Sequence, residues 1–270
     1  MGDAMVSTTI RTKAINICRK AIPAILPGNE KFWKIYAPIL KVLGSSKEVE
    51  QIHDKIVNCL KLNKKDVLLD AGCGYADFLL KVSDKIAVGI GIDFQDKVIV
   101  GAKAKVYERH GLISNISIEH ADLGKSLRFD DNSISAIVSV LVLSYLGVRS
   151  AFPKEAARIL APEGRIALVT PAKGADFLKV LVSEAKQRKD EGSFIKNLPK
   201  LPLAASAVFF GKIAELKDWV GQWHFYTEGE LVDLFESVGL RTLSVERVYA
   251  DQAIMIIAEK PAALPGRQAG

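Results

Sequence analysis

The sequence predicts an α/β protein with a mostly parallel sheet and helices on both faces. From residue 67 onward, short apolar runs alternate with helical patterns, which is typical of a parallel α/β sheet. This alternation breaks after the fifth apolar run and resumes with one helix and two further strands. The chain has 270 residues, of which 49% are hydrophobic, and it can therefore bury a sizeable core.

The apolar runs place the expected strands at Val67–Asp70, Ala87–Asp93, Ser117–His120, Ala136–Val140, Arg165–Thr170, Thr242–Tyr249 and Ala253–Glu259. The stretches between them predict helices over Phe78–Ser83, 97–110 and Lys154–Leu160, the last one closed by Pro162 and Gly164. One more helix is expected from Thr227 to Val238. Thr227 and Glu230 form a capping box at its start, and Gly239 ends it.

Two segments lie outside this alternation. Residues 1–66 predict two or three helices that cover the ligand site, over Ile10–Ile25, Glu30–Leu43 and Lys47–Leu60. Residues 171–226 insert a connection of 56 residues into a sheet domain that spans residues 67–260, and a connection of that length is usually functional. We expect a helical lid, and the alternative is an insert that only completes the core. Residues 261–270 predict a flexible tail.

The formal net charge of +6 is concentrated in those two segments. Residues 1–66 carry 12 basic and 6 acidic side chains, and residues 171–226 carry 9 and 6. A nucleic-acid-binding protein would show a continuous basic stripe with a supporting motif. Since the sequence has neither, no nucleic-acid partner is expected, and the charge indicates an anionic acceptor or surface.

Cysteine usage and hydropathy predict a cytoplasmic protein without a metal site. The three cysteines are widely spaced, with no CxxC pair and no histidine at ligand spacing, so neither a disulfide framework nor a zinc site is expected. No apolar run reaches the roughly 18–20 residues that span a bilayer. Pro23 and Pro27 interrupt the one stretch that could serve as a secretion signal.

A glycine loop after the first strand is the most informative motif. Gly72 and Gly74 let the backbone approach a ligand closely, and the helix that follows offers free N–H groups. Two interpretations compete here. A dinucleotide site would use a third glycine, where this chain has Ala76. A smaller nucleoside ligand needs no pyrophosphate cradle, and Asp70 could hold its cationic amine.

Two further carboxylates favour the nucleoside site. Asp93 ends the second strand, 23 positions after Asp70, where an acid can accept both ribose hydroxyls. Asp122 follows the third strand, where it can accept from an exocyclic amino group. Three acids at the carboxyl ends of three strands point into the crevice where open α/β sheets bind ligands.

The run Asp70-Ala71-Gly72-Cys73-Gly74, together with Asp93, Asp122 and the stretches 129–138 and 158–165, resembles class I S-adenosylmethionine-dependent methyltransferases. Within that family it is most similar to the group of quinone C-methyltransferases and small-molecule or lipid N- and O-methyltransferases. The resemblance implies a Rossmann-like, seven-stranded sheet whose last strand is antiparallel, with S-adenosylmethionine as the cofactor. This chain departs from the family pattern at Ala76 and at Leu143–Leu146, where many relatives carry a histidine pair.

The resemblance also implies roles for individual residues. The methionine moiety lies along Asp70, Ala71, Gly72, Cys73 and Gly74. Asp93 and Phe94 lie at the ribose, Asp122 and Leu123 flank the adenine, Val140 lies under the sulfonium, and Tyr36 approaches the carboxylate from a helix over the cofactor.

Methyl transfer from a sulfonium is an in-line displacement, so alignment in a dry site is the main requirement. A general base helps only where the nucleophile still carries a proton, and the candidates are Tyr145, His224 and Tyr226. The apolar stretch 198–210 and the aromatic residues near 219–226 predict a hydrophobic small molecule or lipid head group, methylated at N, O or C. The basic amphipathic segment 10–25 would suit the surface of an anionic membrane, and the alternative is a solvated helix that packs on the domain.

Two other classes of protein remain possible on the sequence. One is a nicotinamide-dependent oxidoreductase, and the other is a nucleoside-binding domain without catalysis. The oligomeric state is left open.

Overall fold

Seven strands form one sheet in the computed structural model, which describes residues 32, 47–110, 115–147, 150–176, 179–180, 182–183, 186 and 211–262. The expected segment 10–25, Tyr36 and residues 263–270 lie outside these ranges. The strands are β1 (Val67–Ala71), β2 (Val88–Asp93), β3 (Ile116–His120), β4 (Ile134–Val140), β5 (Leu160–Pro171), β6 (Arg241–Val248) and β7 (Ala253–Glu259).

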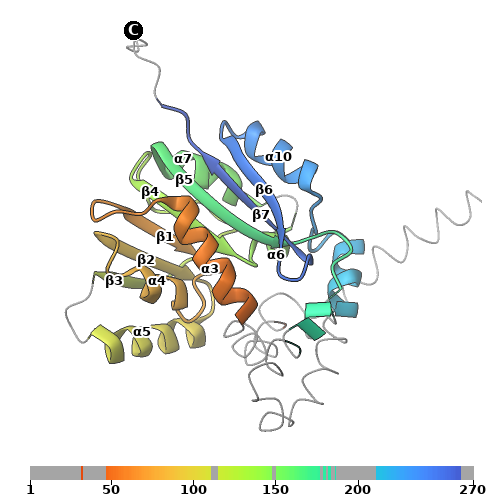
Figure 1. Ribbon diagram of the computed structural model, residues 1–270, viewed down its shortest axis with the longest axis horizontal. Coiled ribbons are helices and arrows are strands. Elements are labelled where there is room, and N and C mark those ends of the chain that lie inside the picture. Colours follow the sequence, from red (N-terminus) through yellow and green to blue (C-terminus); the bar gives the residue numbers. More distant parts are fainter. Residues whose placement is uncertain are drawn as a thin grey trace, which may run out of the picture.

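The strand order places β1 and β4 at the centre of the sheet. The order is β3-β2-β1-β4-β5-β7-β6 (Figure 1). Strands β1 to β5 pair in parallel, whereas β7 runs antiparallel to both β5 and β6. The chain winds outward from β1 to β3 and then returns to β4, and open α/β sheets bind ligands at such a change of direction. The predicted seven-stranded sheet with an antiparallel last strand is confirmed.

Helices cover both faces of this sheet, as predicted (Figure 1). On one face lie α3 (Lys47–Leu60), α4 (Asp77–Val82) and α5 (Asp96–His110), and on the other lie α7 (Phe152–Ile159) and α10 (Glu228–Ser237). The short helix α6 (Leu143–Leu146) follows β4 at its carboxyl end. Helix α3 buries Val49, Ile52 and Ile56 in the core it shares with β1 and β4. This part of the expected N-terminal cover therefore belongs to the helical layer of the sheet.

Local sequence explains the ends of α10. The Thr227 hydroxyl accepts a hydrogen bond from the Glu230 backbone N–H at 3.2 Å, and the Glu230 carboxylate accepts one from the Thr227 N–H at 2.7 Å. This reciprocal pair satisfies N–H groups that have no partner inside the helix. The predicted capping box is confirmed, and Gly239 follows the helix with a φ of 85°.

The connection between α7 and β5 differs from the prediction. Leu160 is extended and pairs with Ile134, so β5 begins directly after α7 and not at Arg165. The next paired residues are Ala136 and Arg165, which leaves residues 161–164 as a bulge opposite a single residue of β4. Gly164 fits this bulge because a Cβ there would lie 2.7 Å from the Ala161 carbonyl oxygen. The helix ends at Ile159, within one residue of the prediction, but Pro162 and Gly164 lie inside β5 and not before it.

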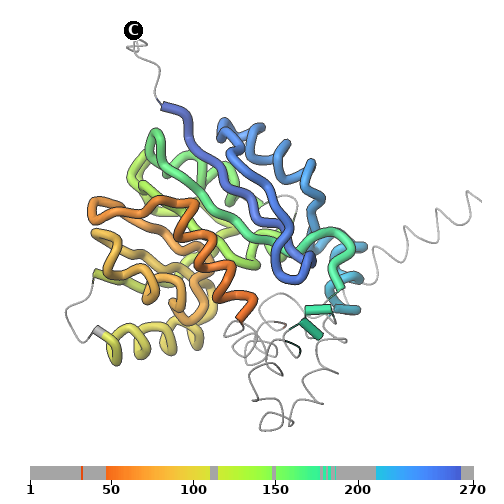
Figure 2. Tube along the Cα trace, viewed as in Figure 1, coloured from red at the N-terminus to blue at the C-terminus, as the bar shows by residue number. Residues whose placement is uncertain are grey.

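Residues 211–226 lie at the carboxyl edge of the sheet, beside the end of β5 (Figure 2). Residues 211–219 are helical, and the segment is fastened at two points. The Lys173 N–H donates to the Tyr226 carbonyl and the His224 N–H donates to the Ser144 carbonyl, each at 2.8 Å. None of the helices within the described ranges has the length and apolar character needed to cross a membrane.

Candidate functional site

The glycine loop at the end of β1 adopts the left-handed backbone that its glycines permit. Gly72 has a φ of 84° and Gly74 a φ of 53°, and the N–H groups of Gly72 and Cys73 both donate to the Ile92 carbonyl of β2. A Cβ on Gly72 would lie 2.4 Å from a methyl of Val142, so the loop packs tightly against the segment after β4. A Cβ on Gly74 would meet nothing within 4 Å, which leaves space beside this residue for a ligand.

Ala76 stands where a third glycine is usual, and it is also left-handed, with a φ of 61°. This conformation costs a non-glycine residue about 1–2 kcal/mol. The Ala76 side chain is fully buried in the core beneath α4. Packing therefore offsets part of the strain in the loop.

Asp70 is a buried carboxylate at the end of β1. It is 4% exposed and has no hydrogen-bond or ion-pair partner in the described part of the chain. Burial, and secondarily the nearby carboxylates of Asp93 and Asp77, raise the pKa of Asp70 to about 8. An isolated buried carboxylate is unfavourable unless a cation or a donor neutralises it. The site therefore fits a ligand that brings its own positive charge.

Asp93 lies next to the glycine loop at the end of β2. One carboxylate oxygen accepts from the Gly74 N–H at 3.3 Å and the other from the Gln95 N–H at 2.9 Å. Burial raises the pKa of Asp93, and these backbone donors oppose that shift. Each oxygen keeps a further lone pair for a ligand hydroxyl. The structure thus brings Asp70, Gly72, Gly74 and Asp93 together, as predicted.

Three other residues of the predicted cofactor site are buried or partly buried in the core around the glycine loop. Ala71 is buried in the sheet core, and Val140 packs partly buried against the core under α3 and α4. Cys73 is buried, and desolvation raises the pKa of its thiol, which indicates a packing residue. Tyr36 lies outside the described residues.

Asp122 and Leu123 begin the loop between β3 and β4. The Asp122 carboxylate accepts from the Gly124 N–H at 2.9 Å, and Leu123 is buried in the core beneath the loop. The Ala121 N–H donates to the Asp93 carbonyl at 2.9 Å. Asp122 and Leu123, which are expected at the adenine, therefore follow β3, the strand that pairs with β2. Asp93, which is expected at the ribose, ends β2.

An aromatic cluster closes the carboxyl edge of the sheet. We use this name for Phe32, Tyr145, Trp223 and Phe225, which pack with Ala214 and against Phe94. The Trp223 ring meets Phe32 edge-on at 4.9 Å and Tyr145 at 4.7 Å. Because Phe94 follows Asp93, this apolar cluster borders the cofactor site.

Lys217 lies within the aromatic cluster, and the sequence analysis did not single it out. Its side chain is fully buried, and its ammonium donates to the Gln222 amide oxygen at 2.8 Å. The same ammonium lies 5.0 Å from the Trp223 ring centre and 5.6 Å from that of Phe32. In the sequence it stands among charged residues of a helix, a pattern that gives no sign of burial.

The three candidate catalytic residues lie on two neighbouring segments. Tyr145 is buried in the aromatic cluster, and desolvation raises the pKa of its phenol, which stays protonated at neutral pH. Half-buried His224 meets the Tyr226 ring edge-on at 4.5 Å. Tyr226 packs into the core with Leu231, and burial raises the pKa of its phenol to about 12. The two tyrosines can donate hydrogen bonds, and His224 is left as the candidate base.

A buried polar contact beneath these residues also went unnoticed in the sequence. The hydroxyls of Ser144 and Thr170 lie 2.5 Å apart, both fully buried. The Thr170 hydroxyl also accepts from the Ser144 N–H at 3.2 Å. This contact joins α6 to the end of β5, and thereby fixes the turn that presents Tyr145.

A separate cavity of about 350 Å³ lies at the opposite edge of the sheet. Its walls include Lys61, Asn63, Ser135, Glu163 and Arg165. These residues stand at the amino ends of β1, β4 and β5, far along the strands from Asp70. The cavity is thus distinct from the site built on the glycine loop.

The family model and one relative that match this chain are both methyltransferases. Residues 69–168 match the family described as a methyltransferase domain. A relative from Amycolatopsis mediterranei, 27-O-demethylrifamycin SV methyltransferase, is 28% identical over 131 residues, which are 48% of this chain and 45% of that protein. This chain thus matches less than half the length of that relative.

Two solved structures share the fold. Geranyl diphosphate C-methyltransferase from Streptomyces coelicolor has a TM-score of 0.56 at 11% identity, covering 78% of this chain and 77% of that one. The [4+2]-cyclase SpnF has a TM-score of 0.61 at 16% identity, covering 88% and 97%. At such identities the likeness concerns the fold alone, and the cyclase illustrates that one fold can carry different chemistry.

Proposed function

We propose that this protein, whose residues 69–168 match the methyltransferase domain family, transfers a methyl group from S-adenosylmethionine to a hydrophobic small molecule or lipid head group. The observation that carries the proposal is the isolated carboxylate of Asp70. It is buried beside a left-handed glycine loop, and no protein cation neutralises it within the described residues. S-adenosylmethionine carries an ammonium group that supplies the missing charge.

Each part of the cofactor has a group of this chain to hold it. Asp70 pairs with the ammonium, and the open space at Gly74 accommodates the methionine chain. Asp93 accepts the ribose hydroxyls with the lone pairs that its backbone donors leave free. Asp122 and Leu123 flank the adenine at the next strand end, and Val140 lies under the sulfonium.

The bound cofactor supplies an already activated methyl group, so the protein mainly has to align the acceptor and exclude water. The aromatic cluster provides the apolar wall for this purpose. Tyr145 donates a hydrogen bond that orients the acceptor, because its phenol stays protonated. His224 removes a proton where the acceptor has one to lose, a contribution of typically 10²–10⁴-fold in rate.

The apolar surroundings support a hydrophobic acceptor. Two similar proteins have names that indicate such substrates, a demethylrifamycin in one and geranyl diphosphate in the other. The excess of basic over acidic residues in segments 1–66 and 171–226 favours an acceptor with an anionic group, or one held at an anionic surface. We also propose that residues 10–25 contact the surface of an anionic membrane, and that the protein is located in the cytoplasm.

The first experiment separates the proposed function from its alternatives. Calorimetry with S-adenosylmethionine and with NADH should show binding of the former alone. Binding of NADH alone would replace the proposal with an oxidoreductase. Cofactor binding with no transfer of labelled methyl to any acceptor in a panel of hydrophobic phenols, acids and lipids would favour a binding domain without catalysis.

A second experiment tests the catalytic roles with matched variants. Tyr145→Phe should slow methyl transfer while the affinity for S-adenosylhomocysteine stays unchanged. Tyr107→Phe, which alters a 58% exposed phenol on α5, should change neither. His224→Gln should reduce the rate for acceptors that must lose a proton. Equal rates for all four proteins would contradict the assigned roles.

The membrane contact is tested separately. The full chain should co-sediment with vesicles that contain anionic lipid and remain in solution with neutral vesicles. A variant that lacks residues 2–27 should lose this binding. Failure of the full chain to bind anionic vesicles would refute the membrane contact and leave methyl transfer to a free small molecule.

A further inference from the structure

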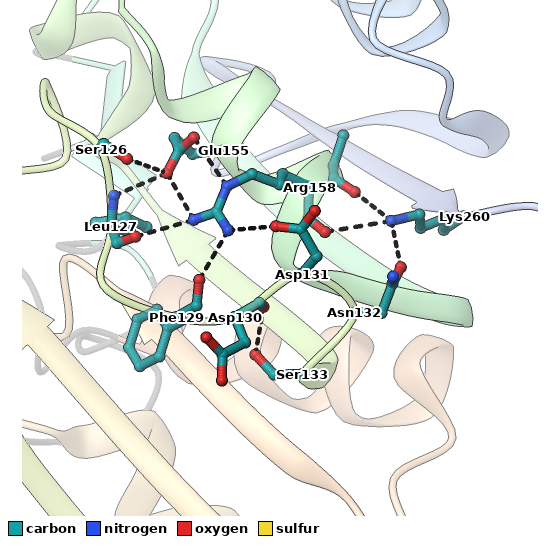
Figure 3. Close-up of polar contacts among 11 residues, drawn as sticks. Ser126, Leu127, Phe129, Asp130, Asp131, Asn132, Ser133, Glu155, Arg158 and Lys260 are labelled. Carbon is teal, nitrogen blue, oxygen red and sulfur yellow. Dashed lines mark hydrogen bonds and ion pairs between the residues drawn. The ribbon is translucent and has the colours of Figure 1, made fainter. Parts of the chain in front are cut away.

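Arg158 of α7 makes the largest number of hydrogen bonds to the loop between β3 and β4 among the side chains that Figure 3 labels. All five N–H groups of the Arg158 guanidinium have a partner. Nη1 donates to the Phe129 carbonyl at 2.8 Å and to Asp131 at 2.7 Å, and Nη2 donates to the Leu127 carbonyl at 2.9 Å. The remaining two donors, on Nε and Nη2, bind the Glu155 carboxylate at 3.1 and 2.9 Å.

Glu155, which binds Arg158, also binds the loop directly. Its carboxylate accepts from the Leu127 N–H at 2.8 Å and from the Ser126 hydroxyl at 3.1 Å (Figure 3). The pKa of Glu155 falls to about 2, chiefly because of its hydrogen bonds to Arg158. The carboxylate is therefore ionised at any physiological pH. Together the two side chains bind both the N–H and the carbonyl of Leu127.

The backbone of α7 is fixed to the far end of the loop. The Arg158 carbonyl accepts from the Asn132 N–H at 3.1 Å. The Lys260 ammonium donates to the Asn132 side chain at 2.8 Å (Figure 3) and to the Ala157 carbonyl at 2.7 Å. Asn132 is left-handed, with a φ of 60°. The loop is thus bound to α7 from residue 126 to residue 132.

This loop begins with Asp122 and Leu123. Its first half has polar contacts of its own: the Ala121 N–H donates to the Asp93 carbonyl, and Asp122 accepts from the Gly124 N–H and pairs with the Lys125 ammonium at 3.4 Å. Leu123 and Leu127 are buried in the core beside α7. The position of Leu127, fixed by Arg158 and Glu155, therefore limits where Asp122 and Leu123 can lie.

We propose that Arg158 is a positioning residue for the adenine half of the cofactor site, acting through the loop of residues 121–133. The inference rests on the proposed function, because it uses Asp122 and Leu123 as the adenine-flanking residues. Residues 129–131 and Arg158 are partners in one contact network, 27 to 29 positions apart along the chain.

Lysine could not replace this arginine. Lysine has three donors on a single nitrogen, whereas the five contacts of Arg158 radiate from a planar group in several directions. Arg158→Lys keeps the charge and most of the stem, so it tests the geometry of the guanidinium. Arg165→Lys is a matched control. Arg165 binds Glu259 and the Cys59 carbonyl, its side chain is 24% exposed against 30% for Arg158, and it makes no contact with the loop.

The experiment measures binding of S-adenosylhomocysteine and of 5′-methylthioadenosine, which has the adenosine but no amino acid. Arg158→Lys should weaken both ligands by the same factor, on the order of tenfold for two lost charged hydrogen bonds. Arg165→Lys should leave both affinities within twofold. Loss of affinity for S-adenosylhomocysteine alone, or an equal loss in the two variants, would overturn the assignment.

Hydrogen exchange of the ligand-free protein gives an independent readout. The Leu127 amide and its neighbours in residues 121–133 should exchange faster in Arg158→Lys, and at the wild-type rate in Arg165→Lys. Should Arg158→Lys fail to fold, Asp131→Asn carries the test, because Asp131 is 70% exposed and provides one contact of the five. This variant should accelerate the hydrogen exchange of the same amides by a smaller factor. An unchanged exchange rate would refute the proposal.

Asp122→Ala separates this inference from the proposed function. Weaker ligand binding in Asp122→Ala with normal binding in Arg158→Lys would sustain the adenine site and refute the role of Arg158. Normal binding in Asp122→Ala would refute the adenine placement itself. No binding by the wild-type protein would refute the proposed function.

Discussion

The glycine-loop side of the site and the aromatic cluster each bury an ionisable group, but only one of the two groups has a protein partner. Asp70 is a buried carboxyl with no hydrogen-bond or ion-pair partner within the described chain, whereas Lys217 is a buried cation that binds Gln222 and lies over two aromatic rings. A charge that the protein has satisfied holds the fold together. A charge that it has left unsatisfied is available to a ligand. The glycine-loop side therefore serves cofactor binding, whereas Lys217 and Trp223 in the aromatic cluster support the fold, and this division can be tested.

The largest effect is expected at the centre of the aromatic cluster. Trp223→Ala removes a fully buried indole and should lower the free energy of unfolding by about 3–5 kcal/mol. Denaturant unfolding measures this loss. Trp219→Ala, at a position that is 37% exposed, is the control and should cost much less. Affinity of the folded Trp223→Ala protein for S-adenosylhomocysteine should change little, and a large loss would contradict the division between the regions.

Asp70→Asn should have its main effect on binding. Removing one partner of a buried charge pair costs about 2–5 kcal/mol, so affinity for S-adenosylmethionine should fall by about 30-fold or more. At a pH near or above 8, where Asp70 ionises in the folded protein, the free variant should be more stable than the wild type, because the uncompensated charge is gone. Asp66→Asn, before the opposite end of β1, should leave the affinity unchanged. Equal affinities in wild type and Asp70→Asn, measured by calorimetry, would remove the main support for the proposed function.

Lys217→Met should show the reverse pattern. Loss of the ammonium leaves the Gln222 amide oxygen without this donor, at a cost of about 1–3 kcal/mol in the free energy of unfolding. Cofactor affinity should not change. Lys212→Met, on the same helix but 72% exposed in its side chain, should alter neither quantity. A gain in stability on removal of Lys217 would mean that the cluster does not satisfy its charge.

The smallest effect is expected in the pH dependence of stability. The pKa of Asp70 rises from 3.8 to about 8 on folding, so the folded protein binds this proton more tightly than the unfolded chain. Its contribution to stability therefore falls as pH rises through that range. His53, whose pKa falls from 6.5 to about 4, opposes this below pH 6.5. Between about pH 6.5 and 8 the ligand-free wild type should lose stability, and thermal unfolding of Asp70→Asn should lack this slope.

The parts of the fold that the sequence predicted well depend on local signals. The capping box at Thr227 and the helix Lys47–Leu60 were placed correctly because capping and amphipathic periodicity act over a few residues. The start of β5 was misplaced for the opposite reason. Pro162 and Gly164 indicate a break, and only pairing with β4 turns them into a bulge within a strand.

The candidate site divides in the same way. Asp70, Gly72, Gly74 and Asp93 could be found because strand ends are recognisable in sequence and parallel strands bring them to one edge. Lys217 and the Ser144–Thr170 contact could not, since their environment comes from segments distant in the sequence. Arg158 stood inside a motif that the sequence analysis used, but nothing in the sequence indicated that its side chain reaches the loop before β4.

The sequence by itself determined the order of strands and helices, the glycine loop and the set of carboxylates, because each depends on the chemistry of neighbouring residues. Only the tertiary structure decided which buried charges are satisfied and which are not. That distinction depends on the distances between side chains from separate elements, and on how far water is excluded around them. Asp70 and Lys217 are each one charged residue among many in the sequence, and only folding makes one available to a ligand and the other part of the core.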